Sequence, residues 1–229
     1  ASSSLSLSIA PTTPALRPDG RFLYFARGDF GEIRMASVDT GAGRLTEGPA
    51  IAAPDLVRSM TIDPVGAHLY VTTATAFSSD TLFLYRVDPS SGALARIPGS
   101  PFAAGFDAAA SNLRPDRVTL DPTGRFAYIQ DRPGRTGARS RGVFVFPVQA
   151  SGLFGPSFLG PFSTPAAEPF LIGDSATFAL DPSGRFAYLT DGTTNTISAF
   201  TVDATTGGLT AVGAPIPIPA GIGMIVVTP

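Results

Sequence analysis

The sequence DPSGRFAYLTD at residues 181–191 is nearly repeated as DPTGRFAYIQD at residues 121–131. Two more distant copies, PDGRFLYFA and PVGAHLYVT, begin at Pro18 and Pro64. The copies are separated by 46, 58 and 60 residues, measured between their tyrosines, Tyr24, Tyr70, Tyr128 and Tyr188. Internal repetition at intervals of a few tens of residues is typical of repeat architectures such as solenoids and propellers.

Each copy lies among short apolar segments that favour β-strands. A segment such as RVTLDP precedes the turn, the aromatic segment follows it, and then come a third segment such as LFLYRVD and a proline-containing fourth segment. Their short length, their β-branched and aromatic residues, and the Gly, Pro, Asp and Ser between them all indicate strands. No apolar pattern with a 3.6-residue period is sustained, so we expect almost no helix.

Four strands per repeat predict the blades of a β-propeller. Middle strands such as FAYL and VFVF are apolar at nearly every position, as expected for a sheet buried on both faces. Proline accumulates in the fourth segment, which suits an edge strand because proline donates no ladder hydrogen bond. We therefore predict an all-β chain forming a single propeller domain or part of one over residues 1–229, with four-stranded blades at about 11–53, 57–103, 115–163 and 174–219 and an extra inner strand at 222–229.

The composition limits the classes of partner. Of the 229 residues, 44% are hydrophobic and only 15% charged, with a net charge of −2, so nothing favours nucleic acid or an anionic membrane surface. Cysteine is absent, which removes disulfides, thiol nucleophiles and thiolate metal sites. No apolar run approaches the roughly 20 residues of a membrane-spanning helix. The chain begins ASSSLSLS without Met, as a processed protein would, and we expect a periplasmic or extracellular bacterial protein.

The repeated motif itself is interpreted as a structural turn. Asp accepts local backbone hydrogen bonds, Pro restricts φ, and Gly takes a conformation that other residues avoid. Arg17 replaces the Asp in the first repeat and Ala67 replaces the Arg in the second, so neither charge is required in every copy. His68, the only histidine, is aligned with the Arg that follows the turn elsewhere, which predicts a surface residue near the turn rather than a general base.

Charged residues just before the innermost strands are the first candidates for a binding site, because that edge of a propeller opens on the central channel. They differ between repeats, and variation on a regular scaffold is where a site can be built. Ordinary solvated channel charges are the alternative. The candidates are Arg58, Asp116, Arg117 and Asp174.

A second candidate is the arginine-rich loop RPGRTGARSRG, inserted between the second and third strands of the third repeat. Its arginines could bind phosphate or an acidic partner, and a solvated loop explains them equally well. They are Arg132, Arg135, Arg139 and Arg141. The aromatic run at residues 152–162 predicts outer-strand packing, or a protein contact where exposed. Because no Asp-x-Asp-x-Asp loop and no phosphate-binding glycine loop is present, we expect no metal and no cofactor.

The spacing of VDPSSGALARIPGSPF and DPTGRFAYI resembles the lactonase-like branch of bacterial β-propellers, which is related to the YVTN repeat proteins. The resemblance implies a seven-bladed ring, and some members are 6-phosphogluconolactonase-like enzymes with His or Glu around the channel. The equivalent positions here hold Ser59, Arg117 and Thr177. Seven blades would need roughly 330 residues. The chain would therefore be a portion of a larger propeller, a smaller closed ring, or a piece whose spare strands pair with another copy.

Two functional hypotheses follow. The first is a non-catalytic binding or assembly module whose partner is another protein or further copies of itself, with the segments SLSLSIA (4–10) and GMIVVTP (223–229) completing a blade between chains. The second is a lactonase-like hydrolase acting on a sugar lactone in the channel, with water as the nucleophile. It would use Arg58, Arg117 and either Asp116 or Asp174.

Overall fold

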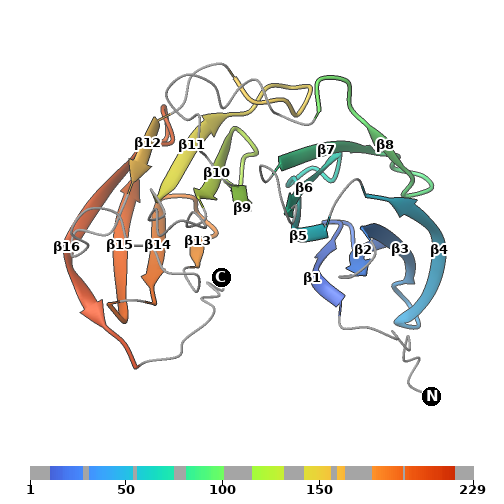
Figure 1. Ribbon diagram of the computed structural model, residues 1–229, viewed down its shortest axis with the longest axis horizontal. Helices are drawn as coiled ribbons and strands as arrows, with labels where there is room; N and C mark the ends of the chain where they lie inside the picture. The colour runs from blue at the N-terminus through green and yellow to red at the C-terminus, as the bar shows by residue number, and fades with distance from the viewer. Residues whose placement is uncertain are drawn as a thin grey trace. The chain divides into compact units, whose positions relative to one another are not determined.

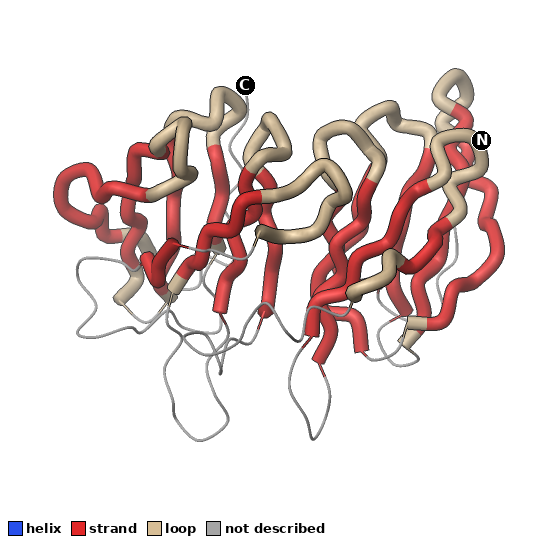
Figure 2. The backbone as a smooth tube through the Cα atoms, turned by 90° about the horizontal axis from the view of Figure 1, so that it is seen from above, coloured by secondary structure: helices blue, strands red, loops and turns tan. Residues whose placement is uncertain are grey.

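The computed structural model contains four β-sheets (Figures 1 and 2), and its described residues contain no helix. It describes residues 11–27, 31–53, 56–74, 81–100, 115–131, 142–155, 159–162, 177–192 and 194–219. Two compact units are present: the first is Ala1–Asp107 with Asp116–Val118, and the second is Ala108–Pro115 with Thr119–Pro229. The extra strand expected at 222–229 and the leading segment 4–10 lie outside the described residues.

The four sheets have four strands each, and neighbouring strands follow one another along the chain. The first two sheets lie in the first unit, and the third and fourth lie in the second unit except for Asp116–Val118, which belong to the first. The first sheet consists of β1 (Pro11–Leu16), β2 (Phe22–Arg27), β3 (Glu32–Asp39) and β4 (Arg44–Ala52). The second sheet consists of β5 (Leu56–Ile62), β6 (His68–Ala74), β7 (Thr81–Val87) and β8 (Leu94–Arg96). The third sheet consists of β9 (Pro115–Leu120), β10 (Phe126–Asp131), β11 (Val143–Pro147) and β12 (Leu159–Phe162). The fourth sheet consists of β13 (Phe178–Leu180), β14 (Phe186–Asp191), β15 (Thr196–Val202) and β16 (Leu209–Pro217). The predicted all-β class with four four-stranded sheets is confirmed.

The repeated motif forms the tight turn between the first and second strands of each sheet. The Asp121 backbone N–H donates to the carbonyl of Phe126 at 3.0 Å, and the Phe126 N–H donates to Asp121 Oδ1 at 2.7 Å. Gly124 closes the turn with a positive φ of 72°, and Gly184 does the same with 69°. Only glycine adopts this conformation without strain. The motif therefore builds the hairpin, as predicted.

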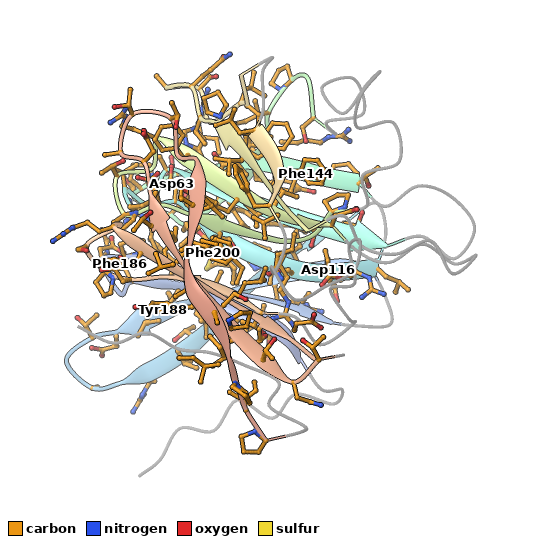
Figure 3. All side chains as sticks on the ribbon, turned by 90° about the vertical axis from the view of Figure 1, so that its left-hand side faces the viewer. Asp63, Asp116, Phe144, Phe186, Tyr188 and Phe200 are labelled. Carbon is orange, nitrogen blue, oxygen red and sulfur yellow. The ribbon has the colours of Figure 1, made fainter. Side chains whose placement is uncertain are left out.

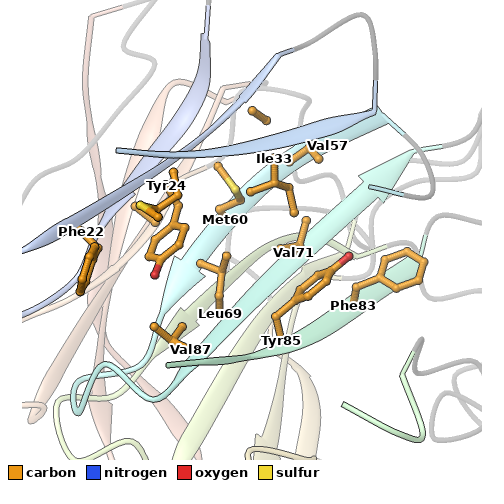
Figure 4. Close-up of a cluster of buried hydrophobic side chains, with 13 residues drawn as sticks. Phe22, Tyr24, Ile33, Val57, Met60, Leu69, Val71, Phe83, Tyr85 and Val87 are labelled. Carbon is orange, nitrogen blue, oxygen red and sulfur yellow. The ribbon is translucent and has the colours of Figure 1, made fainter. Parts of the chain in front are cut away.

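A hydrophobic core lies between the two sheets of each unit. In the first unit it includes Phe22, Tyr24, Ile33, Met60 and Leu69 (Figure 4). In the second unit it is formed by Phe126, Tyr128, Val143, Val145, Phe178, Ala187, Leu189, Phe200 and Leu209. All six residues of β10 are buried, so this strand is covered on both faces as predicted, whereas Phe186 and Tyr188 of β14 are only partly buried. The aromatic residues after the turn in the first and third sheets point into these cores, toward the sheet that follows in the chain.

The fourth strand of each sheet is an edge strand, and in β4, β12 and β16 proline lies in a bulge. β4 bulges at Gly48 and Pro49, β12 at Gly160 and Pro161, and β16 between Val212 and Ile216, which contains Pro215. A bulge absorbs residues that the ladder does not pair, and proline has no N–H to leave unpaired. The predicted placement of proline on outer strands is confirmed for β12 and β16, whereas Pro98 lies just beyond β8.

Candidate functional site

Three of the predicted channel charges come together at the start of two inner strands. Arg58 is the third residue of β5, and Asp116 and Arg117 are the second and third residues of β9. Arg58 Nη1 lies 3.4 Å from Asp116 Oδ1, and Arg117 Nε lies 3.8 Å from Asp116 Oδ2. Figure 3 labels Asp116 on its strand. We call these three residues the inner-strand cluster.

The inner-strand cluster carries two guanidinium groups and one carboxylate, so the formal charges of these three side chains sum to +1. The side chains of Arg58 and Arg117 are 35% and 36% exposed, and that of Asp116 is 22% exposed. Guanidinium groups remain charged at any accessible pH and present planar sets of donors to oxyanions. The arrangement is therefore chemically suited to binding an anion.

Two threonine hydroxyls hold the inner-strand cluster in place. Thr72 Oγ1 donates to the carbonyl of Asp116 at 2.7 Å, and Thr61 Oγ1 donates to the carbonyl of Val118 at 2.6 Å. These bonds tie β9 to β5 and β6 within the first unit. Neither threonine was among the residues predicted for the site. The signal that could have indicated them is that each hydroxyl lies in an otherwise largely apolar strand segment.

Two of the three positions expected to hold His or Glu in a lactonase-like propeller are buried in their sheets instead, and the third is Arg117 of the inner-strand cluster. Ser59 is 6% exposed and lies on β5 directly after Arg58. Thr177 is also 6% exposed, and its backbone N–H donates to Thr190 Oγ1 at 2.7 Å. Neither residue offers an ionisable group.

His68 does not occupy the position that we assigned to it. It is the first residue of β6 and aligns with Phe22, Phe126 and Phe186, the aromatic residue after the turn, while Ala67 takes the Arg position. Its side chain is only 13% exposed, so the prediction of a surface residue is wrong. His68 Nδ1 lies 2.8 Å from Asp63 Oδ2, where the imidazole closes the turn between β5 and β6. This turn lies at the opposite end of β5 from Arg58.

The remaining candidates fall partly or wholly outside the described residues. Asp174 lies outside them, and so does the whole set Arg132, Arg135, Arg139 and Arg141. Of the aromatic run at 152–162, the Phe154 ring stacks on Phe146 of β11 with centroids 5.4 Å apart, which is the packing expected of this segment. Leu159 on β12 is 42% exposed.

Within the described ranges, no three His, Cys, Asp or Glu side chains gather as ligands for a metal ion. The same part of the chain holds no helix long and apolar enough to cross a membrane.

Solved structures with a similar fold include two lactonase-type proteins. A candidate 6-phosphogluconolactonase from Bacteroides fragilis matches 91% of this chain with a TM-score of 0.68 and 20% identity. The periplasmic gluconolactonase PpgL of Pseudomonas aeruginosa matches 93% with a TM-score of 0.66 and 20% identity. The β-propeller domain of Myceliophteria thermophila Cps50 matches 88% of this chain and 56% of its own length, with a TM-score of 0.53 and 13% identity.

These similarities show that the chain has a β-propeller fold like that of the lactonase-like proteins, which confirms the resemblance at the level of fold. This chain spans just over half of the two lactonase-type structures, 55% of the Bacteroides fragilis protein and 59% of the Pseudomonas aeruginosa protein. No protein-family model and no curated protein matches the sequence.

Proposed function

We propose that this chain contributes to a lactonase-like hydrolase that acts on an anionic sugar lactone at the inner-strand cluster. The observation that carries the proposal is the cluster itself, which holds two partly exposed guanidinium groups around one carboxylate at the start of two inner strands. The similarity in fold to a periplasmic gluconolactonase and to a candidate 6-phosphogluconolactonase supports the reaction class.

The chemistry required is hydrolysis of a cyclic ester. Water attacks the carbonyl carbon, negative charge develops on the carbonyl oxygen, and the ring C–O bond then breaks. The ring oxygen takes up a proton, and the product is an open hydroxy acid. Arg58 and Arg117 would bind the anionic group of the substrate or stabilise the developing oxyanion, while Asp116 orients both guanidinium groups. Since Asp116 is already paired with two cations, its main role is to position them.

A hydrolysis assay with gluconolactone and with its 6-phosphate tests the proposal. Removing one oxyanion-stabilising donor typically lowers kcat by about 10²–10³, and we expect a loss of this order for Arg58→Ala or Arg117→Ala. Arg86→Ala is the matched control, because Arg86 is an exposed arginine on β7 of the same sheet as Arg58. Absence of turnover above the spontaneous rate in the unchanged protein would reject the hydrolase.

One observation favours a non-catalytic alternative, in which the same cluster only binds its ligand. The sole histidine of the sequence is engaged with Asp63 at the far end of β5 and does not reach the cluster as a general base. Calorimetric titration with the hydroxy acid product distinguishes the two functions. Binding that is lost in Arg58→Ala, together with no turnover by the unchanged protein, would establish the binding module.

The periplasmic location of the Pseudomonas aeruginosa protein supports an extracytoplasmic location for this one as well. Fractionation of cells that express the complete gene product tests it, and recovery in the cytoplasmic fraction would reject it.

A further inference from the structure

The two sheets within each unit are joined by a tyrosine and a glycine. In the first unit the Tyr24 hydroxyl on β2 donates to the carbonyl of Gly92 at 2.7 Å. In the second unit the Tyr128 hydroxyl on β10 donates to the carbonyl of Gly207 at 3.0 Å. Both tyrosines are fully buried. Each glycine lies in the turn before the outer strand of the following sheet, so one sheet presents the tyrosine and the next presents the glycine.

These joints leave no room for a side chain on the glycine. A Cβ added to Gly92 would lie 2.5 Å from Cδ1 of Phe22, and a Cβ added to Gly207 would lie 2.7 Å from Cγ of Phe126. The phenylalanine that follows the repeated turn therefore packs directly against the glycine backbone. The Phe and the Tyr, two residues apart on the second strand, therefore bind the glycine turn together. We call this pair, Phe22 and Tyr24 or Phe126 and Tyr128, the receptor.

The fourth sheet carries the same receptor on its other face. Ala187 and Leu189 of β14 point into the core shared with the third sheet, so Phe186 and Tyr188 lie on the opposite face, where both are only partly buried (Figure 3). On this face a row of cross-strand neighbours continues from Tyr188 to Ala199 and Val212. Val212 is 47% exposed. We call this surface the open receptor face.

The equivalent positions in the joint of the first unit are covered. Ile33 pairs with Ile51 in the first sheet, where Ile33 is fully buried and Ile51 packs against the core. The corresponding pair in the fourth sheet is Ile197 and Ile216, and Ile216 is 64% exposed. A sheet face that packs elsewhere in this molecule is thus left accessible to solvent, which is the signature of an interaction surface.

The complementary part lies at the other end of the same chain, in the turn between β3 and β4. This turn is built like those of Gly92 and Gly207: Asp39 Oδ1 accepts hydrogen bonds from the backbone N–H groups of Gly41 and Ala42, and Gly43 N–H donates to the Asp39 carbonyl at 2.7 Å. Gly43 has a φ of 65°, and a Cβ added to it would meet no described atom within 4 Å. Leu16, on β1 of the same sheet, is 52% exposed, so this sheet also carries an apolar side chain that is accessible to a partner.

We propose that the open receptor face binds the Gly43 turn of a second copy of this chain, head to tail, with the Tyr188 hydroxyl donating to the Gly43 carbonyl. A second copy is the occupant because this chain supplies both halves of a joint that it already uses twice. The contact is heterologous, so repeating it produces either a closed ring or a linear assembly. It pairs the faces of two sheets and is distinct from the edge pairing of terminal strands considered above.

Light scattering and sedimentation of the 229-residue chain over a wide concentration range test the proposal. We expect reversible self-association by the unchanged chain. Gly43→Leu blocks the turn, and Ile216→Arg introduces a charge at an already exposed position of the receptor face, so each variant alone should be monomeric. Gly99→Leu is the matched control, because Gly99 has a φ of 86°, is exposed and has no described atom within 4 Å of an added Cβ.

Mixing the two blocked variants gives the decisive result. The Gly43→Leu chain keeps an intact receptor face and the Ile216→Arg chain keeps an intact Gly43 turn, so the mixture should form a one-to-one dimer that stops there. A symmetric interface or misfolded variants would not produce this complementation. Tyr188→Phe should weaken association about tenfold, as expected for one lost hydrogen bond.

A monomeric unchanged chain at all concentrations would overturn the proposal and would leave the receptor face to a further blade of a longer polypeptide. Persistent association of Gly43→Leu, or a mixture that stays monomeric, would overturn it as well. Lactone hydrolysis is measured separately, because none of these substitutions touches the inner-strand cluster.

Discussion

The strands β10 and β14 have nearly the same sequence but different surroundings. They read FAYIQD at residues 126–131 and FAYLTD at residues 186–191. The turns that precede them contain the same hydrogen bonds. Every residue of β10 is buried, whereas Phe186 and Tyr188 of β14 are partly exposed. The difference arises in the glycine turn of Gly207, which covers Phe126 and Tyr128. Burial of the aromatic pair is therefore a property of the following sheet.

The environment also changes the chemistry of the tyrosine. Burial raises the pKa of Tyr128 well above its usual value, with a further contribution from the carboxylate of Asp121. Burial likewise raises the pKa of Tyr24 to about 12. Both hydroxyls therefore remain hydrogen-bond donors to a more alkaline pH than an ordinary tyrosine would. The following predictions compare positions around β10 with their counterparts around β14.

The largest difference is expected for the phenylalanine after the turn. Phe126→Ala should lower the free energy of unfolding by about 3–5 kcal/mol, because it opens a cavity in the core of the second unit. Phe186→Ala should lower it by only about 1–2 kcal/mol, because less apolar area is removed from a partly exposed position. Urea denaturation measures both. Equal losses would contradict the difference in burial between Phe126 and Phe186.

A side chain on the glycine turn should have the next largest effect. Gly207→Ala places a Cβ 2.7 Å from the Phe126 ring and 2.9 Å from Val145 Cγ1 at a positive φ of 72°. We expect a loss of about 2–4 kcal/mol, the sum of overpacking and left-handed strain. Gly43→Ala carries only the strain and should lose about 1 kcal/mol when measured on the monomer. Thermal denaturation at low protein concentration compares them, and similar losses would contradict the close approach at Gly207.

Removing single hydroxyls should have a smaller effect. Tyr128→Phe leaves the buried carbonyl of Gly207 without its donor and should lower the free energy of unfolding by about 1–2 kcal/mol. Tyr188→Phe should change the stability of the monomer by less than about 0.5 kcal/mol. Chemical denaturation of both variants checks the pair. A loss in Tyr188→Phe as large as that in Tyr128→Phe would mean that both hydroxyls have intramolecular acceptors.

Lowering the pH should have the smallest effect on stability, and it should act through Asp203 in the turn of Gly207. Backbone hydrogen bonds from Thr206 and Thr205 hold the pKa of Asp203 below its usual value of 3.8. A lowered pKa contributes stability above 3.8 that is lost as the pH falls through the value in the folded state. The melting temperature of the unchanged protein should therefore fall on acidification below about pH 4, and Asp203→Asn should show a shallower fall. Identical pH profiles would exclude a role for this carboxylate.

Much of the fold could be predicted because its signals are local. The turn Asp-Pro-x-Gly needs only its own side chains and backbone, and Gly124 and Gly184 behave alike for that reason. The prediction for His68 was wrong because the repeat has an Arg position followed directly by a Phe position. The second repeat holds Ala67 and His68 there, so the sequence did not show which position the histidine occupies. The charges Arg58 and Asp116 were predicted as channel candidates from their place before inner strands. Their ion pair and its threonine supports could not be predicted, because they join residues far apart in the chain.

By itself, the sequence determined the strands, the turns and the repetition of a Phe-x-Tyr face on the second strand of three sheets, because hydrogen bonding and side-chain alternation within a few residues produce them. Only the tertiary structure decided which of these faces is covered. Tyr24 and Tyr128 each meet the glycine turn of the next sheet, and Tyr188 has the same local sequence with its face open to solvent. The reason is physical: burial and a paired hydroxyl require a second surface, and a strand does not encode the surface that packs against it.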